Sequence, residues 1–217
     1  MLKFVAVALL LAACSVWGDQ CCMPKQWESF TAIENTTVVA GTIKVTQTYA
    51  NESYDFDKKK FASVDAATGV RTVLDFTKHM MYTIVAKMCF TSPWPFPISS
   101  PMMHCVPDNA TLLASFEMGG SGGFVIDQYD LQAFYPGYKG YMEFSRPGCL
   151  PFSHAKYFDS HEAMFGFTNV TEGIKDPSVF DIPSPPCPAM DIDSVVKPLL
   201  FEPAHPWERE PPMTKSG

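Results

Sequence analysis

The chain has 217 residues, of which 47% are hydrophobic and 18% charged, and its formal net charge is −7. This length and composition suit one globular domain with a buried core and exclude global disorder. The sequence contains no basic block, which argues against a nucleic-acid partner.

Residues 1–18 have the features of a secretory signal peptide. Lys3 supplies the positive start, and the apolar stretch 4–13 is shorter than the ~20 residues that a membrane helix needs. Val16 and Gly18 suit cleavage before residue 19. We therefore expect a secreted, extracellular protein, with the lysosomal lumen and the extracellular matrix as further destinations of this route.

A rival interpretation of this segment is a bacterial lipoprotein box, because Leu11-Ala12-Ala13-Cys14 matches that pattern. Four N-glycosylation sequons favour a eukaryotic secretory route instead. They lie at Asn35, Asn51, Asn109 and Asn169, each expected beside a turn or in a polar loop.

Seven cysteines occur in the chain, and removal of the segment that contains Cys14 leaves six. An even number in a secreted chain indicates three disulfides. Metal binding is the alternative, but no Cys-x-x-Cys spacing typical of zinc sites is present. The six are Cys21, Cys22, Cys89, Cys105, Cys149 and Cys187.

Most of the remaining chain has the pattern of short β-strands. Residues 38–49 alternate apolar and polar side chains, as in a strand with one buried face. Residues 51–53 and Thr68-Gly69 predict turns. Other strands are expected within 21–28, 53–65 (a hairpin), 70–76, 80–87, 112–118, 124–134, 138–145 and 164–170, with a Pro-rich loop over 95–107. These short segments predict a mostly β fold of antiparallel hairpins, a sandwich or half-barrel with one or two short helices.

The composition changes after Pro183, because nine of the 19 prolines lie in residues 183–217. The apolar positions Ile192, Val195, Val196 and Leu199 have helical spacing and predict a short helix over 191–197. We expect three parts: the signal peptide 1–18, one β domain over 19–200 and a mobile Pro-rich tail over 201–217.

One motif suggests a hydrolase, because residues 119–123 fit the pattern G-x-S-x-G with Ser121 as nucleophile, and Asp159 and His161 follow in hydrolase order. Such a nucleophile needs a strand, a sharp turn and a helix. The segment after residue 123 is rich in β-branched and aromatic residues, so a flexible turn is expected and no enzymatic activity.

Metal-binding patterns are weak. No histidine pair has zinc-like spacing, and Asp55 and Asp57 are not followed by an EF-hand loop. The histidines are His79, His104, His154, His161 and His205.

The 12 methionines are partly clustered, at Met80, Met81, Met88, Met102 and Met103. This flexible side chain suits cavities for adaptable ligands, although ordinary core filling explains any single one.

Near the C-terminal end, Asp176-Pro177-Ser178 predicts a turn, and Val179 and Phe180 predict a short buried strand. The string Gly-Ile-Lys-Asp-Pro-Ser-Val-Phe, followed by Pro and Cys, resembles the C-terminal signature of the ependymin-related family of secreted glycoproteins. The signature residues are Lys175, Asp176, Pro177, Ser178, Val179 and Phe180. The opening Pro24-Lys25-Gln26-Trp27-Glu28, with Cys21 as the matching cysteine, also resembles the family, as do Tyr54-Asp55, Pro93-Trp94 and Gly119-Gly120.

The resemblance implies two curved antiparallel sheets around a deep apolar pocket, and a homodimer. It implies binding of a hydrophobic small molecule or lipid, with Ca²⁺ as a candidate ion whose ligands the sequence does not identify. Relatives also occur in the extracellular matrix, including mineralised tissue of molluscs. A structural role through matrix components, surface glycans and acidic groups is therefore the alternative.

The resemblance also implies the pairs Cys21–Cys149 and Cys89–Cys187. Of the cysteines without clear family counterparts, Cys22 and Cys105 then form the third pair. The choice between Cys21 and Cys22 stays open, because adjacent strand residues point to opposite faces.

Overall fold

The structure is a computed structural model that describes residues 20–39, 41–92, 102–135, 137–157, 161–183 and 187–189. The predicted signal peptide, the Pro93-Trp94 pair, the helix over 191–197 and the tail over 201–217 lie outside these residues.

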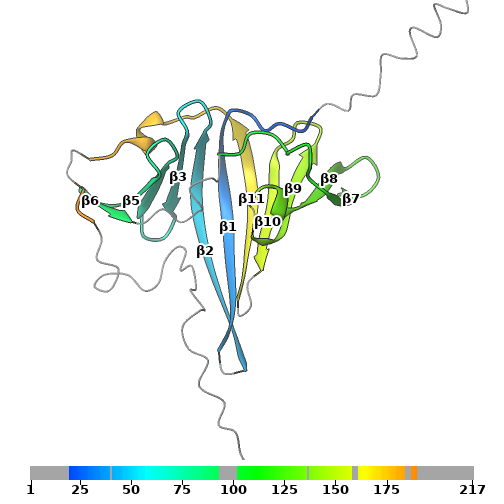
Figure 1. Cartoon of the computed structure of the whole chain (residues 1–217), viewed down its shortest axis with the longest axis horizontal. Helices are drawn as coiled ribbons and strands as arrows, with labels where there is room; N and C mark the ends of the chain where they lie inside the picture. Colours follow the sequence, from blue (N-terminus) through cyan, green and yellow to red (C-terminus); the bar gives the residue numbers. More distant parts are fainter. Residues whose placement is uncertain are drawn as a thin grey trace, which may run out of the picture.

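The described residues form eleven strands in one antiparallel sheet (Figure 1). The strands are β1 (Gln26–Val39), β2 (Thr42–Asp55), β3 (Lys60–Asp65), β4 (Arg71–Asp75), β5 (Met80–Val85), β6 (Met88–Ser92), β7 (Leu112–Met118), β8 (Phe124–Asp130), β9 (Lys139–Arg146), β10 (Pro151–Tyr157) and β11 (His161–Glu172). Their order is β6-β5-β4-β3-β2-β1-β11-β10-β9-β8-β7. The prediction of a mostly β, antiparallel fold is confirmed.

The sheet is continuous, where the resemblance implied two sheets. The reason is β1, whose 14 residues pair with β2 on one side and with β11 on the other. This strand therefore joins the two series of neighbouring strands, β2 to β6 and β7 to β11, into a single hydrogen-bonded sheet.

Two short 3-10 helices accompany the sheet, η1 (Leu131–Ala133) and η2 (Pro177–Phe180). The prediction of a strand at Val179 and Phe180 is wrong, because η2 occupies these positions. Asp176 caps this helix by accepting a hydrogen bond from the backbone N–H of Ser178, and Pro177 stands in the first turn, which tolerates a missing N–H.

Two further local predictions require correction. Residues 51–53 form no turn, since β2 runs through them and the side chains of Glu52 and Ser53 are buried. Strand β10 was not expected, because His154 and Lys156 stand at two of its inward-facing positions and weaken the apolar alternation.

The alternation of side chains gives the central strands two faces. The core face carries Trp27, Thr31 and Ile33 of β1, and the outer face carries Phe30 and Ala32. A cluster of buried side chains covers the core face: Met23, Trp27, Tyr54, Met102, Val106, Leu131, Phe134, Met142, Phe144 and Cys149. The N-terminal segment, residues 102–110, residues 131–135 and Tyr138 therefore pack on this face.

A second cluster lies on the outer face of β3 to β6. Ala62, Val73 and Tyr82 pair across these strands and contact Phe180 and the segment around it. Hence residues 174–183, which include the family-like signature, and Cys187 cover this part of the outer face.

Three disulfides link the segments that pack on the two faces to the sheet or to each other, and the six cysteines indicated this number. Their pairs are the ones that the family resemblance implied. Cys21–Cys149 and Cys22–Cys105 join the N-terminal segment to the β9–β10 turn and to the 102–110 segment. Cys89–Cys187 joins β6 to the segment on the outer face.

Candidate functional site

Five rings form a continuous strip on the core face across the four central strands. Tyr54 of β2 stacks on Trp27 of β1 at 5.2 Å between ring centroids, and Trp27 meets Phe167 of β11 edge-on at 5.9 Å. His154 of β10 lies 5.8 Å from Phe167 and stacks on Phe165 at 4.1 Å. We call these five residues the aromatic strip.

The strand register produces this arrangement. Trp27 is the direct cross-strand partner of Tyr54, and His154 is the partner of Phe165, so each pair shares a face. Phe167 pairs with Thr31 of β1 and therefore points to the same face. The apolar interior that the sequence predicted is thus found on the core face.

Three members of the strip carry a buried polar atom without a hydrogen-bond partner among the described residues: Trp27 Nε1, Tyr54 Oη and His154 Nε2. Only 4% of Trp27 and 6% of Tyr54 is exposed. Burial raises the pKa of Tyr54 above its usual range. Burial, and to a smaller degree the charge of Lys156, lowers the pKa of His154 far below its ordinary value. Both groups are therefore neutral at physiological pH.

Lys156 lies near one end of the strip. Its ammonium is 5.5 Å from the ring centroid of Tyr135, 5.6 Å from that of Tyr138 and 5.8 Å from that of Phe165. Three rings around one cation give favourable cation–π contacts. Burial lowers the pKa of Lys156 to about 8, so this amine loses its proton more readily than a surface lysine.

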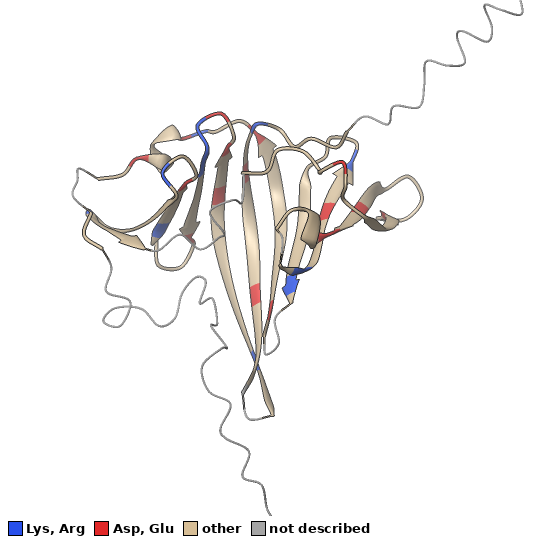
Figure 2. Ribbon diagram, in the orientation of Figure 1, with Lys and Arg blue, Asp and Glu red and all other residues tan. Residues whose placement is uncertain are grey.

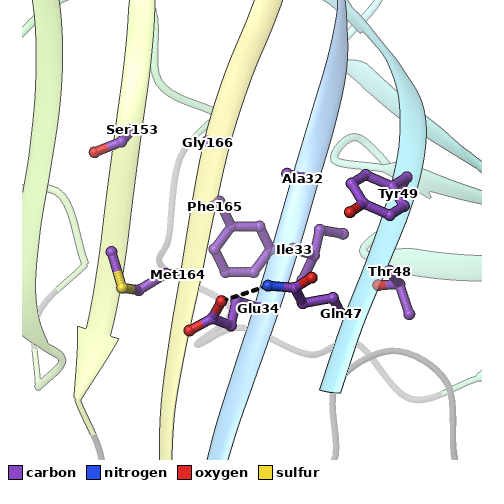
Figure 3. A pocket seen from close by; sticks show the side chains of 10 residues that line it. All are labelled: Ala32, Ile33, Glu34, Gln47, Thr48, Tyr49, Ser153, Met164, Phe165 and Gly166. Carbon is purple, nitrogen blue, oxygen red and sulfur yellow. Dashed lines mark hydrogen bonds between the residues drawn. The ribbon is translucent and has the colours of Figure 1, made fainter. Parts of the chain in front are cut away.

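A hollow of about 270 Å³ lies on the outer face over β10, β11, β1 and β2 (Figure 3). Its lining residues are Ala32, Ile33, Glu34, Gln47, Thr48, Tyr49, Ser153, Met164, Phe165 and Gly166. Tyr49 of β2 and Met164 of β11 stand on opposite sides (Figure 3), and Gly166 lies two residues from Met164 on β11, level with Ala32 and Tyr49. A Cβ on Gly166 would meet nothing within 4 Å, so this glycine leaves the hollow open.

The central strands around this hollow carry few charges, as Figure 2 shows for β1, β2 and β11. One polar contact lies at its edge, where Gln47 Nε2 donates a hydrogen bond of 2.8 Å to Glu34 Oε2.

The four predicted sequons lie in different settings. Asn109 is exposed in a turn, as expected. Asn35 is half-buried within β1, and Asn51 and Asn169 are exposed within β2 and β11, so the expected neighbouring turns are absent there.

The hydrolase pattern lacks its structural context. Ser121 is exposed in the turn between β7 and β8, and a strand follows it where a nucleophile elbow needs a helix. Asp159 lies outside the described residues, and His161 begins β11.

Potential metal ligands do not gather within the described part of the chain, where no group of three or more His, Cys, Asp or Glu side chains could hold an ion. Asp55 accepts hydrogen bonds from Gln26 and from the backbone of Lys58, whereas Asp57 pairs with Lys25. The described residues also contain no helix that is long and apolar enough to cross a membrane.

The methionines do not form one cluster. Met102 and Met103 join the core-face cluster, and Met80 packs against the outer-face cluster. Met88 is 60% exposed.

Comparison with known proteins gives one family match. The family model described as Ependymin matches residues 65–187. No curated protein matches the chain.

Several solved structures are similar to part of this chain. An uncharacterized conserved protein from Thermus thermophilus is 8% identical with a TM-score of 0.47, over 77% of this chain and 90% of that chain. The lipoprotein LppX from Mycobacterium tuberculosis is 10% identical with a TM-score of 0.39, over 68% and 88%. A LolA superfamily protein from Nitrosomonas europaea is 6% identical with a TM-score of 0.35, over 75% and 93%.

Proposed function

The chain belongs to the ependymin family, and we propose that it is a secreted glycoprotein that binds a hydrophobic or amphipathic ligand, such as a lipid, without catalysing a reaction. The core face is the proposed place of binding. An apolar chain would lie along the aromatic strip after partial displacement of the segments that pack on it.

One observation carries this proposal: the stacked side chains of Trp27 and Tyr54 each have a buried polar atom, Nε1 and Oη, without a hydrogen-bond partner among the described residues. A buried polar group without a partner costs about 1–3 kcal/mol. A ligand oxygen that accepts a hydrogen bond from one of these groups would remove that cost for the group. Polar groups inside an apolar surface therefore suit a ligand with an oxygen-bearing head and an apolar tail.

The test is a titration with a fluorescent long-chain fatty acid, using Tyr54→Phe, which removes Oη and keeps the stacked ring. We expect the affinity to fall by about 5- to 10-fold, the equivalent of about one hydrogen bond. Tyr49→Phe on the outer face is the matched control and should leave the affinity unchanged. Equal affinities of the wild type and Tyr54→Phe would contradict the proposed site.

A second candidate function is structural, in the extracellular matrix, including mineralised matrix. The observation that favours it is the packed core face, since side chains occupy the space where a carrier would keep a cavity. Mass spectrometry of lipids that co-purify with the native protein separates the two roles. A matrix protein would purify without a lipid and would remain with the insoluble matrix fraction.

Further properties follow from the same family expectation. We propose a homodimer, and stabilisation by Ca²⁺, which thermal unfolding with calcium and with chelator would test. We also propose N-glycans at Asn35, Asn51, Asn109 and Asn169, and the division into 1–18, 19–200 and 201–217.

A further inference from the structure

The outer face of the central strands carries a contiguous apolar surface. Phe30 is 36% exposed, Tyr49 46% and Met164 39%. The hollow lined by Ala32 and Gly166 lies between Tyr49 and Met164. Residues 174–183 cover the neighbouring strands β3 to β6 but do not cover this surface. An exposed apolar surface of this kind normally contacts another molecular group.

The sequon at Asn51 opens directly beside this surface. Asn51 is exposed, and it is the cross-strand partner of Phe30 in the β1–β2 pair. Tyr49 lies two residues away on β2 and therefore on the same face, at about 7 Å along the strand. A sugar attached to Asn51 would therefore start beside Phe30 and could extend along the strand toward Tyr49.

The two rings form a flat platform. Phe30 and Tyr49 stack with ring centroids 5.8 Å apart and an angle of 7° between their planes. The C–H face of a pyranose is apolar and packs well on aromatic rings, and its N-acetyl methyl group needs an apolar contact. The hollow beyond Tyr49 offers that contact, with the carboxylate of Glu34 at its edge to accept hydrogen bonds from sugar hydroxyls.

We propose that the first sugars of an N-glycan on Asn51 lie on the Phe30–Tyr49 platform and over the hollow, so that the glycan covers this face. This inference rests on the glycoprotein part of the proposed function and not on ligand binding at the core face. The glycan acts as an intramolecular cover, as residues 174–183 do for the adjacent strands.

The experiment uses the full chain secreted from animal cells, with high-mannose glycans that can be trimmed to a single N-acetylglucosamine. The melting temperature is measured for the wild type, Asn51→Gln, Phe30→Ala/Tyr49→Ala and the combined variant. Asn109→Gln removes a sequon in an exposed turn and is the matched control.

We expect Asn51→Gln to lower the melting temperature by about 2–4 °C, which is a typical effect of losing one favourable contact in a chain of this size. The protein trimmed to one N-acetylglucosamine should keep most of the difference in melting temperature, because this first sugar contacts the Phe30–Tyr49 platform. In the Phe30→Ala/Tyr49→Ala background, Asn51→Gln should have no further effect. Asn51→Gln alone should also increase binding of an apolar surface dye, and Asn109→Gln should not.

Three results would overturn the proposal. Peptide mapping could find Asn51 without a glycan. The effect of Asn51→Gln could be the same with and without the two aromatic rings. The glycosylated wild type could form a dimer that Tyr49→Ser disrupts, which would assign this face to a second copy of the chain. Fatty-acid binding is measured separately and should be unchanged in Asn51→Gln, so a failure of ligand binding is distinguishable from a failure of this proposal.

Discussion

Thr31 of β1 donates a hydrogen bond of 2.8 Å from its Oγ1 to Oε2 of Glu52 on β2, and both side chains are buried on the core face. Thr31 in turn shares a hydrogen bond of 3.0 Å with Ser29. Burial raises the pKa of Glu52 to about 7, and the hydrogen bond from Thr31 opposes this shift without cancelling it. The folded protein therefore binds this proton more tightly than the unfolded chain does.

Glu52 should make the free energy of unfolding depend on pH. The pKa is near 4.5 when the chain is unfolded and about 7 when it is folded, so only the folded state keeps the proton between these values. The contribution of Glu52 to the free energy of unfolding is fully present below about pH 4.5, and it is lost as the pH rises through about 7. We expect Glu52→Gln to be more stable than the wild type at pH 8, by up to about 3 kcal/mol, and equally stable at pH 4.

Urea unfolding at pH 4, 6 and 8 measures this effect. Glu34→Gln is the control, because Glu34 is half-exposed on the outer face of the neighbouring strand. A constant difference between Glu52→Gln and the wild type across this range would show that the proton does not remain on Glu52.

Arg71 should hold the helix η2 on the outer face. Its Nη1 donates hydrogen bonds to the backbone carbonyls of Ser178 at 2.7 Å and of Val179 at 2.9 Å. Arg71→Met keeps an apolar stem and leaves both carbonyls without this donor. We expect a loss of about 1–2 kcal/mol in the free energy of unfolding.

The matched variant is Lys175→Met, in the same segment. Its Nζ lies 3.9 Å from Glu28, and its side chain is 79% exposed, so the loss should stay below roughly 0.5 kcal/mol. Denaturant unfolding compares the two variants. Losses of equal size would mean that Arg71 contributes as an ordinary surface charge.

Most strands were predictable because their alternation is clear in the sequence. The alternation gave the wrong prediction where residues on the neighbouring strand determine whether a segment forms a strand or a turn. Asn51-Glu52-Ser53 has the composition of a turn, yet Ser29 lies opposite Glu52 and Thr31 donates a hydrogen bond to it, so β1 supplies polar partners inside the sheet. A polar residue opposite a polar residue can be buried in a strand, and this relationship exists only once the register is known.

The aromatic strip was not predictable for a related reason. In the sequence, Trp27 and Tyr54 belong to two separate family-like motifs. His154 was one of five histidines without a specific role. Their contact depends on β1 pairing with both β2 and β11, and the register of β11 opposite a strand more than 120 residues earlier cannot be obtained from local patterns.

Gly140 should tolerate no side chain. Its φ is +140°, and a Cβ would lie only 1.9 Å from the carbonyl oxygen of Ala155 on β10. Gly140→Ala must therefore separate β9 from β10, and we expect a loss of more than about 3 kcal/mol or failure to be secreted. Gly166→Ala is the control, because its Cβ would meet nothing within 4 Å. Yield and melting temperature measure both variants, and a stable Gly140→Ala protein would contradict the β9–β10 pairing.

The disulfide between Cys89 and Cys187 should hold residues 174–183 on the outer face. It closes a sequence separation of 98 residues, and the contacts of Phe180 with Ala62 and Val73 form beneath the same segment. Removing a disulfide of this kind costs about 2–5 kcal/mol. In Cys89→Ser/Cys187→Ser we therefore expect faster amide hydrogen exchange in η2, and unchanged exchange in η1 on the core face. Cys22→Ser/Cys105→Ser should show the opposite pattern, with faster exchange in residues 102–110 and a protected η2, because that disulfide joins the two segments that pack on the core face.

Peptide mapping of the unreduced wild type provides the reference. A link between Cys149 and Cys187 would contradict this arrangement, because one disulfide would then connect the covers of opposite faces.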